Sequence, residues 1–207
     1  MARTQARRET VTTAEAAFVA GLSLRKVQKA IDAGPIRPVR EDRRRVLDEA
    51  DLVYLMAMKE LEGQLKPEAR CAFYDAVKTG RDGEGSSLAA TFGHDLKTHV
   101  TAVKQRLARV RQLRALVEVR RGRGPVIKGT TIEVHRIAAL LEGGASIERV
   151  LADHPALSRA QVVAAGDYAM AHPKVGRPFP ARSIKQAFDE AKLDGLADVL
   201  DAQRARR

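Results

Sequence analysis

The chain has 207 residues, of which 37 are basic and 26 acidic, and its formal net charge at pH 7 is +11. This length suits one or two domains of ordinary size. Hydrophobic residues make up 44% and charged residues 30%, a balance typical of globular proteins and not of disordered ones. Only 4% of the residues are aromatic and tryptophan is absent, so we expect aliphatic cores in a mainly α fold.

The sequence lacks the marks of membrane, secreted and disulfide-bonded proteins. No apolar stretch approaches the ~20 residues needed to cross a bilayer. The basic residues near the N-terminus are not followed by the apolar core of a secretory signal. Cys71 is the only cysteine, which excludes an internal disulfide and a cysteine-based zinc site. We therefore expect a cytoplasmic protein with no membrane association and no cofactor.

Residues 12–33 carry the pattern of two short helices joined by a tight turn. Thr12 or Thr13 can cap the first helix, and Gly21 can end it, because glycine tolerates the left-handed conformation of a tight turn. A second helix over residues 24–33 completes a helix-turn-helix pattern. Its exposed side is expected to carry side chains suited to base edges and phosphates, namely Ser23, Arg25, Lys26, Gln28 and Lys29. A helical hairpin with solvated charges is the alternative.

Two β-prone runs, residues 36–39 and 45–47, follow the second helix and are joined by a basic turn. They predict a hairpin wing that contacts phosphate through Arg43, Arg44 and Arg45. Asp48 or Glu49 then opens another helix, which ends near Gly63. Residues 12–61 resemble the MerR-like winged-helix domain, in which a helix-turn-helix precedes a wing and a helix that begins D-x-x-x-L. The resemblance implies a DNA-binding domain over residues 10–63.

Residues 64–119 are expected to form a helical linker. One helix begins near Pro67, and its predicted inward positions are Ala69, Ala72, Phe73, Ala76 and Val77. Residues 94–119 contain neither Pro nor Gly and predict one long helix with a narrow apolar seam, which could pair between subunits or lie on the chain's own core. The segment 97–128 contains ten basic residues and a single acidic residue, Glu118. This segment favours nucleic acid or an acidic protein as partner over a merely solvated face.

The stretch 124–173 combines a turn, a β-prone alternation and three helices, of which Ser146 and Ser158 can cap the last two. It contains P-x-I-x-G-T-x-I-x-V, then G-A-S-x-E-x-V-L-x-D-x-P-x-L and finally Y-A-x-x-H-P. These motifs are similar to a bacterial family known as domain of unknown function 433, which implies a trihelical, homeodomain-like module over residues 120–173. The last helix offers few basic residues, so we interpret this module as a folding and dimer-forming unit.

The two-domain layout is similar to a VapB-type antitoxin. That resemblance implies a homodimer that binds double-stranded DNA at its own operator and neutralises a PIN-domain ribonuclease toxin. Residues 174–207, a Pro-spaced arm followed by two short amphipathic helices, would then order on the toxin, although packing on the chain itself is the alternative. The residues expected to bind the toxin are Arg177, Phe179, Arg182, Ile184, Phe188 and Leu196.

No sequence motif of catalysis is present. The five histidines form no H-E-x-x-H, and no P-loop, G-x-S-x-G or C-x-x-C occurs. We therefore predict a binding protein and not an enzyme. The alternatives to the antitoxin hypothesis are a stand-alone MerR-like transcriptional regulator and an RNA-associated scaffold that uses the basic middle helix.

Overall fold

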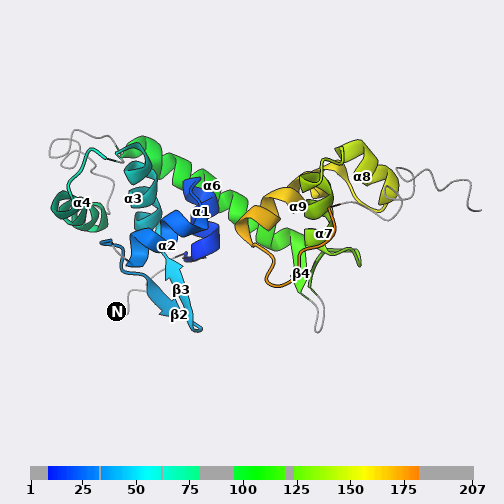
Figure 1. The fold of residues 1–207 in the computed structure, drawn as a ribbon, viewed down its shortest axis with the longest axis horizontal. Helices are drawn as coiled ribbons and strands as arrows, with labels where there is room; N and C mark the ends of the chain where they lie inside the picture. The colour runs from blue at the N-terminus through cyan, green and yellow to red at the C-terminus, as the bar shows by residue number, and fades with distance from the viewer. Residues whose placement is uncertain (1–8, 33, 62, 80–95, 120–123, 182–207) are drawn as a thin grey trace, which may run out of the picture. The chain divides into compact units, whose positions relative to one another are not determined.

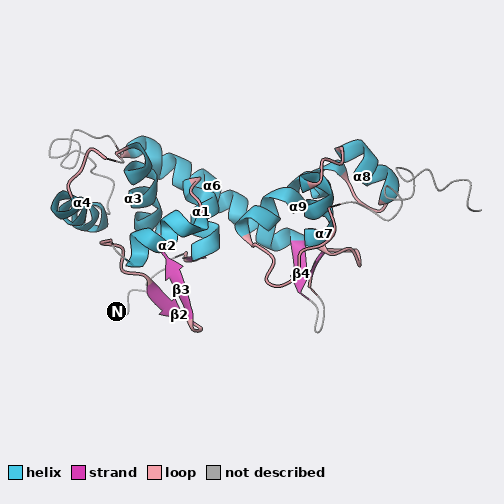
Figure 2. Cartoon of the chain, viewed as in Figure 1, coloured by secondary structure: helices cyan, strands magenta, loops and turns pink. Residues whose placement is uncertain are grey.

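The computed structural model describes residues 9–32, 34–61, 63–79, 96–119 and 124–181. These residues form eight helices and two small antiparallel sheets, so the described part of the chain is mainly α, as predicted (Figure 1; Figure 2). Contacts divide the chain into two compact units, Met1–Arg114 with Met170–Pro173 and Ala115–Ala169 with Lys174–Arg207. Within the described ranges, no helix combines the length and apolar character needed to span a bilayer.

The first unit opens with the element order β-α-α-β-β. The elements are β1 (Val11–Thr12), α1 (Thr13–Ala20), α2 (Leu24–Asp32), β2 (Val39–Glu41) and β3 (Arg44–Leu47). The strands form one antiparallel sheet in the order β1-β3-β2, in which Val46 of β3 lies opposite Thr12 on one side and Val39 on the other. This arrangement is compatible with a winged helix.

Local signals set the ends of α1 and the start of α2, as predicted. The Thr12 hydroxyl accepts a hydrogen bond from the Glu15 N–H, and the Glu15 carboxylate accepts one from the Thr12 N–H, which makes a capping box. Gly21 ends α1 in the left-handed conformation, with φ of 64°. The Ser23 hydroxyl accepts a hydrogen bond of 3.3 Å from the backbone N–H three residues on and caps α2.

The connection from α2 to the hairpin is tight. A Cβ atom on Gly34 would lie 2.2 Å from the carbonyl oxygen of Ala30, so only glycine fits where the chain leaves the helix. β2 begins at Val39, later than the predicted run 36–39. Ile36 instead belongs to the hydrophobic core, at 3% exposure, and Pro38 has no N–H to donate to a strand partner.

Helices α3 (Glu49–Glu60) and α4 (Pro67–Thr79) complete one side of the first unit. Asp48 caps α3, as predicted, through a capping box with Asp51. On α4 the prediction of inward residues was partly wrong: Ala72 is exposed and Tyr74 is buried. The helix turns this tyrosine inward because its hydroxyl donates a 2.8 Å hydrogen bond to the buried carboxylate of Asp51.

The long basic helix, α6 (Lys97–Leu116), packs on its own chain. Its seam residues Val103, Leu107 and Val110 belong to the hydrophobic cluster that also holds residues of α1 and α3. The prediction that this helix continues to residue 119 was wrong. It ends at Leu116, and the chain continues as β4 (Val117–Val119), because β-branched residues there pair with a second strand.

The second unit is a β-hairpin followed by three helices, which agrees with the predicted trihelical module. Its elements are β4, β5 (Pro125–Ile127), α7 (Val134–Glu142), α8 (Ile147–Asp153) and α9 (Arg159–Ala171). Ser146 caps α8 with a 3.1 Å hydrogen bond from the Arg149 N–H, as predicted. The core of this unit contains Ile127, Ile137 and Val162, each fully buried.

Candidate nucleic-acid interface

The outer face of α2 carries the side chains that the sequence predicts for DNA contact. Val27 and Ile31 are buried, so they mark the inner face of the helix. Because successive residues are rotated by about 100°, Arg25 and Lys29 lie about 160° from Val27 and point outward. All five predicted positions are exposed: Ser23, Arg25, Lys26, Gln28 and Lys29. The amphipathic character of α2 therefore leaves a continuous polar and basic face open to a partner.

An ion pair holds the β2–β3 hairpin beside this face. Arg45 donates a 2.6 Å hydrogen bond to the carboxylate of Asp32, the last residue of α2. Both side chains are exposed, so the pair adds little to the free energy of folding, but it shows that the hairpin lies along the flank of α2 that carries Gln28. Arg45, one of the predicted phosphate contacts, thus lies next to the end of α2.

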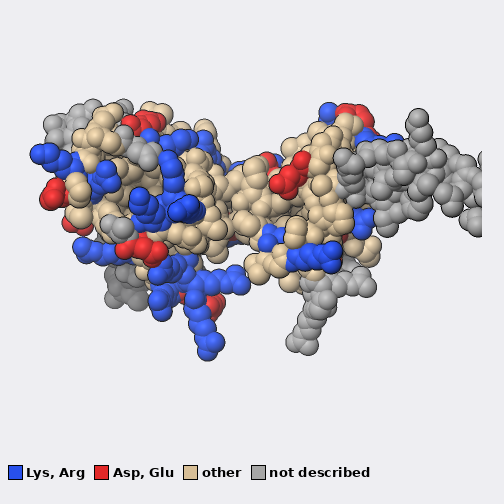
Figure 3. All heavy atoms as spheres, viewed as in Figure 1, with Lys and Arg blue, Asp and Glu red and all other residues tan. Residues whose placement is uncertain are grey.

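The hairpin tip has an unusual backbone. Asp42 and Arg43 have φ values of 47° and 65°, and the flanking Glu41 and Arg44 lie opposite one another in the ladder. This is the geometry of a two-residue type I′ turn, which favours Asn-Gly or Asp-Gly. An arginine in place of the glycine is exposed at the tip, and Figure 3 shows basic side chains gathered over the hairpin.

The cations of α6 are used largely within the first unit. Arg114 forms two hydrogen bonds of 2.6 Å with the carboxylate of Glu15, one from Nε and one from Nη2. Arg106 donates a 2.6 Å hydrogen bond to the carbonyl oxygen of Val19 at the end of α1. Sequence reasoning missed both contacts, because they join residues about ninety positions apart. The positive charge of α6 is therefore partly structural.

Glu15 is the buried acid that pairs with Arg114. Its side chain is 1% exposed, and its carboxylate also accepts the capping hydrogen bond of Thr12. Burial alone would raise the pKa of Glu15, but the hydrogen bonds and charge of Arg114 outweigh it and lower that pKa overall. The Nε2 atom of His172 lies 3.3 Å from the same carboxylate, so a protonated imidazole would add to this effect.

A second polar cluster joins α4 to the start of α3. The Lys78 ammonium lies 2.8 Å from Asp48 and 2.7 Å from Asp51, which is nearly fully buried. Burial would lower the pKa of Lys78, but its hydrogen bonds to these two carboxylates raise it. The Tyr74 hydroxyl accepts a 3.2 Å hydrogen bond from the Arg37 N–H and so ties the segment before the hairpin to α4. This cluster therefore ties the residues on either side of the hairpin, Arg37 and Asp48, to α4.

The second unit offers a weaker footprint for nucleic acid. Arg159 of α9 donates a 2.7 Å hydrogen bond to Glu148, and the Gln161 side chain accepts one of 2.8 Å from the Ser158 N–H. Gly129 has φ of 81°, and the Thr130 hydroxyl donates a 2.8 Å hydrogen bond to the carbonyl of Ile127, so both residues shape the turn after β5. These polar residues therefore serve the unit's own turns and helix ends.

Only the first part of the predicted toxin-binding tail lies in the described ranges. Arg177 is exposed and Phe179 is half-buried. Lys174 donates a 2.7 Å hydrogen bond to the carbonyl of Arg177, and its ammonium lies 5.1 Å from the centre of the Phe179 ring. The remaining predicted positions lie outside the described residues: Arg182, Ile184, Phe188 and Leu196.

No metal centre is evident in the part of the chain that the structure describes. No three His, Cys, Asp or Glu side chains there are grouped so that they could hold a metal ion. His99 is buried, and its Nε2 atom lies 3.5 Å from the carboxylate of Glu60.

Comparison with known proteins identifies the second unit. Residues 118–169 match the model of the family described as Protein of unknown function (DUF433). The match runs from β4 nearly to the end of α9 and covers about a quarter of the chain. No curated protein and no solved structure matches the chain. Residues 118–169 therefore form a DUF433 domain.

Proposed function

We propose that this protein is a DNA-binding regulator whose first unit acts as a winged helix. In this proposal α2 enters the major groove, where Arg25 and Lys29 contact base edges and phosphates, and the β2–β3 hairpin contacts the neighbouring backbone. The observation that carries the proposal is that a basic hairpin lies beside the exposed basic face of α2, where Arg45 contacts Asp32.

The hairpin tip adds support of a different kind. A non-glycine residue held in the left-handed region costs about 1 kcal/mol or more, and such strain is found preferentially at functional positions. Arg43 occupies a place that glycine would fill with less strain. A phosphate contact by this guanidinium would account for an arginine at that position.

The basic helix α6 is less well suited to be the main nucleic-acid surface. Arg114 is occupied by the carboxylate of Glu15, and Arg106 by the carbonyl oxygen of Val19. An RNA-binding scaffold built on α6 would have to break these contacts. The arrangement therefore favours α2 and the hairpin as the binding face.

Fluorescence anisotropy with the duplex upstream of the gene, at several salt concentrations, tests this proposal. Replacing Arg25, Lys26 and Lys29 together by alanine should abolish the preference for that duplex over an unrelated one. The matched control replaces Lys97, Lys104 and Arg111 of α6, which removes the same charge and should leave the preference intact. Retained preference in the first variant, or its loss in the control, would place the DNA-binding face elsewhere.

The finer part of the proposal is that the protein is the antitoxin of a type II toxin–antitoxin pair. The DUF433 domain and the resemblance of the layout to VapB-type antitoxins support it. In this proposal a homodimer represses its own operon, and the tail beginning at Lys174 neutralises a PIN-domain ribonuclease through contacts that include Arg177 and Phe179. A stand-alone transcriptional regulator is the alternative.

Co-expression with the product of the neighbouring gene separates these two functions. The full chain should be retained with that product in a pull-down and should restore growth when the product is toxic. A chain without residues 174–207 should lose both effects while keeping its affinity for DNA. If the full chain retains no neighbouring product and the deletion leaves growth unchanged, the stand-alone regulator is the correct function.

A further inference from the structure

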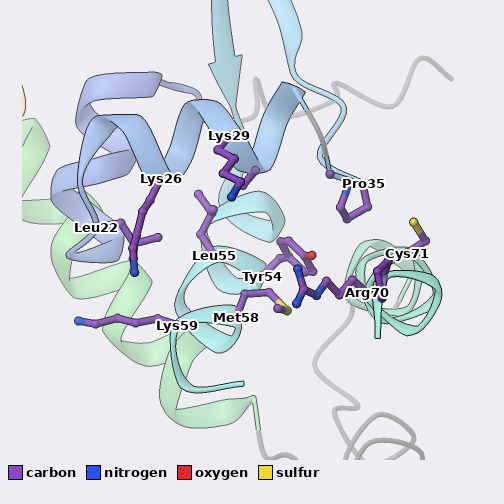
Figure 4. A pocket seen from close by; sticks show the side chains of 13 residues that line it. Leu22, Lys26, Lys29, Pro35, Tyr54, Leu55, Met58, Lys59, Arg70 and Cys71 are labelled. Carbon is purple, nitrogen blue, oxygen red and sulfur yellow. The ribbon is translucent and has the colours of Figure 1, made fainter. Parts of the chain in front are cut away.

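A pocket of about 390 Å³ lies in the first unit between α2, α3 and the start of α4 (Figure 4). Its volume falls in the range of small-molecule sites in proteins. α2 borders the pocket with Lys26 and Ala30, which lie on the flank opposite to that of Gln28 and Asp32. Since Asp32 pairs with the hairpin, the pocket and the hairpin lie on opposite sides of the outward face of α2.

The floor of the pocket is apolar. Tyr54 and Leu55 of α3 are 3% and 2% exposed, and the half-buried Leu22 and Met58 extend this surface. Burial raises the pKa of Tyr54 to about 12, so its ring contributes apolar surface and its hydroxyl stays uncharged near neutral pH. A ligand that fills the floor must therefore bring an apolar body of its own.

The rim of the pocket is cationic. Lys26 and Lys29 come from α2, Lys59 from the end of α3 and Arg70 from α4, and none of the described residues that line the pocket is acidic. In Figure 4 the Arg70 side chain extends from α4 toward Tyr54 and Met58. Its Nε donates a 3.0 Å hydrogen bond to the carbonyl of Leu65, which holds the guanidinium in place. Lys59 extends away from Arg70 in Figure 4, and its ammonium lies beside the turn at Gly21. The positive potential over the low-dielectric floor therefore comes mainly from Arg70 and the lysines of α2.

We propose that this pocket binds a small amphipathic organic anion, an aromatic or branched aliphatic carboxylate whose apolar body covers Leu55 and Met58. The carboxylate would accept charge-assisted hydrogen bonds from the Arg70 guanidinium and the lysine ammonium groups of the rim. Inorganic phosphate would bind the cations of the rim but leave the apolar floor uncovered, and a neutral aromatic molecule would cover the floor but bring no negative charge to the rim. The site therefore selects for both properties in one molecule.

Lys26 and Lys29 also belong to the face proposed for DNA, so the ligand and DNA should compete for the same cations. This consequence rests on the proposed function, whereas binding of the anion does not. The pocket would then act as an effector site within the DNA-binding unit, in which a carboxylate lowers the affinity for DNA by neutralising one flank of α2.

Titration of the full-length protein with 2-naphthoate tests the inference. Methyl NMR of ¹³C-labelled methionine provides the readout, because Met58 lines the pocket and Met56, two residues away, does not. We expect a Kd of about 0.1–1 mM, as is usual for a ligand of this size, with a shift of the Met58 signal and little change at Met56. Neutral 2-naphthalenemethanol and inorganic phosphate should each bind at least about tenfold more weakly.

Three variants localise the site. Arg70→Gln and Lys29→Gln should each weaken 2-naphthoate binding by about fivefold to tenfold, since each removes a cation from the rim. Arg25→Gln removes an equal charge from α2 at a position that does not line the pocket, and it should leave naphthoate binding unchanged. Equal affinity for the neutral analogue, unaltered binding by both rim variants, or absence of any Met58 shift would overturn the inference.

The same samples distinguish this inference from the proposed function. Anisotropy without naphthoate measures DNA binding alone, and NMR without DNA measures anion binding alone. A protein that binds naphthoate but no DNA would refute the DNA-binding function and leave the pocket assignment standing. A protein that binds DNA but no naphthoate would refute the pocket assignment and leave the DNA-binding function standing.

Discussion

Replacing Arg114 by alanine should destabilise the first unit by removing the cation that faces a buried carboxylate. The native guanidinium makes two hydrogen bonds of 2.6 Å to Glu15, which is 1% exposed. Alanine at position 114 leaves this acid with the Thr12 contacts of its own capping box and with His172 nearby. The destabilisation should therefore greatly exceed that of an ordinary surface substitution.

The structure sets the expected size of this effect. Breaking a fully buried ion pair by removing one partner costs about 3–5 kcal/mol. The Arg114 side chain is 41% exposed, so water can reach the carboxylate once the guanidinium is gone, and we reduce the expected cost to about 2–3 kcal/mol. Arg111→Ala is the matched control on the same helix. Its single 3.2 Å pair with Glu9 is largely exposed and should contribute less than about 0.5 kcal/mol.

Native-state hydrogen exchange, read by mass spectrometry on peptides covering residues 9–32, measures the free energy of opening α1. This local readout is preferable to a single urea midpoint, because a protein with two compact units need not unfold in one step. Equal losses of protection in Arg114→Ala and Arg111→Ala would refute the assignment of Glu15 and Arg114 as the anchor between α1 and α6.

The same pair makes a prediction for pH. The pKa of Glu15 is lowered in the folded protein from its ordinary value of 4.5, so its ionised form stabilises the fold above the unfolded pKa. That contribution is lost as the pH falls through the lowered folded-state pKa. His172 lies 3.3 Å from Glu15, so the comparison is made in the His172→Gln background. There the difference in opening free energy between Glu15 and Glu15→Gln should be constant from pH 7 to about pH 5.5 and should shrink in stronger acid. A difference that does not change in acid would contradict this linkage.

Three further substitutions test individual features of the first unit. Gly34→Ala should lower stability by about 2 kcal/mol in thermal unfolding, because its Cβ would meet the Ala30 carbonyl, whereas Gly63→Ala, with open space around its Cβ, should cost about half as much. Arg43→Gly should raise the thermal midpoint, by the equivalent of about 1 kcal/mol, while reducing the salt dependence of DNA binding. Tyr74→Phe should cost about 1–2 kcal/mol in urea unfolding, since it removes the hydroxyl partner of a buried carboxylate.

The features that the sequence predicts well are those decided by neighbouring residues. A threonine three residues before a glutamate makes the capping box of α1, and Gly21 supplies the left-handed end. The Ser146 hydroxyl caps α8 by accepting a hydrogen bond from the Arg149 N–H. The exposed side of α2 follows from the buried positions of Val27 and Ile31 through helical geometry alone. For these elements the candidate site can be predicted by spacing.

The features that the sequence predicts poorly depend on contacts between distant residues. The α6 helix stops at Leu116 because Val117–Val119 finds a strand partner after it, and this pairing outweighs the absence of any helix-breaking residue. Tyr74 points inward from α4 because its hydroxyl donates a hydrogen bond to the buried carboxylate of Asp51 on α3. Neither partner can be identified from the periodicity of the segment itself, since both lie elsewhere in the chain.

Charge is the clearest case of this limit. Composition points to the segment 97–128 as the most basic surface, yet Arg106 and Arg114 within it contact the end and the buried acid of α1. A cation that donates two short hydrogen bonds to a buried carboxylate is not available to a phosphate without breaking part of the fold. On α2 the exposed cations lie next to a second basic element, the β2–β3 hairpin. These two elements together contain fewer basic residues than the segment 97–128.

The angular positions on α2 explain how one short helix can serve three neighbours. Rotation by about 100° per residue directs Val27 to the core, Asp32 to the hairpin and Lys26 to the pocket. Arg25 and Lys29 remain on the outward face between the hairpin and the pocket. A partner on that face is therefore bordered by a fixed hairpin on one side and by a cationic rim on the other, and any anion held in the pocket changes the potential of the face without requiring the hairpin to move.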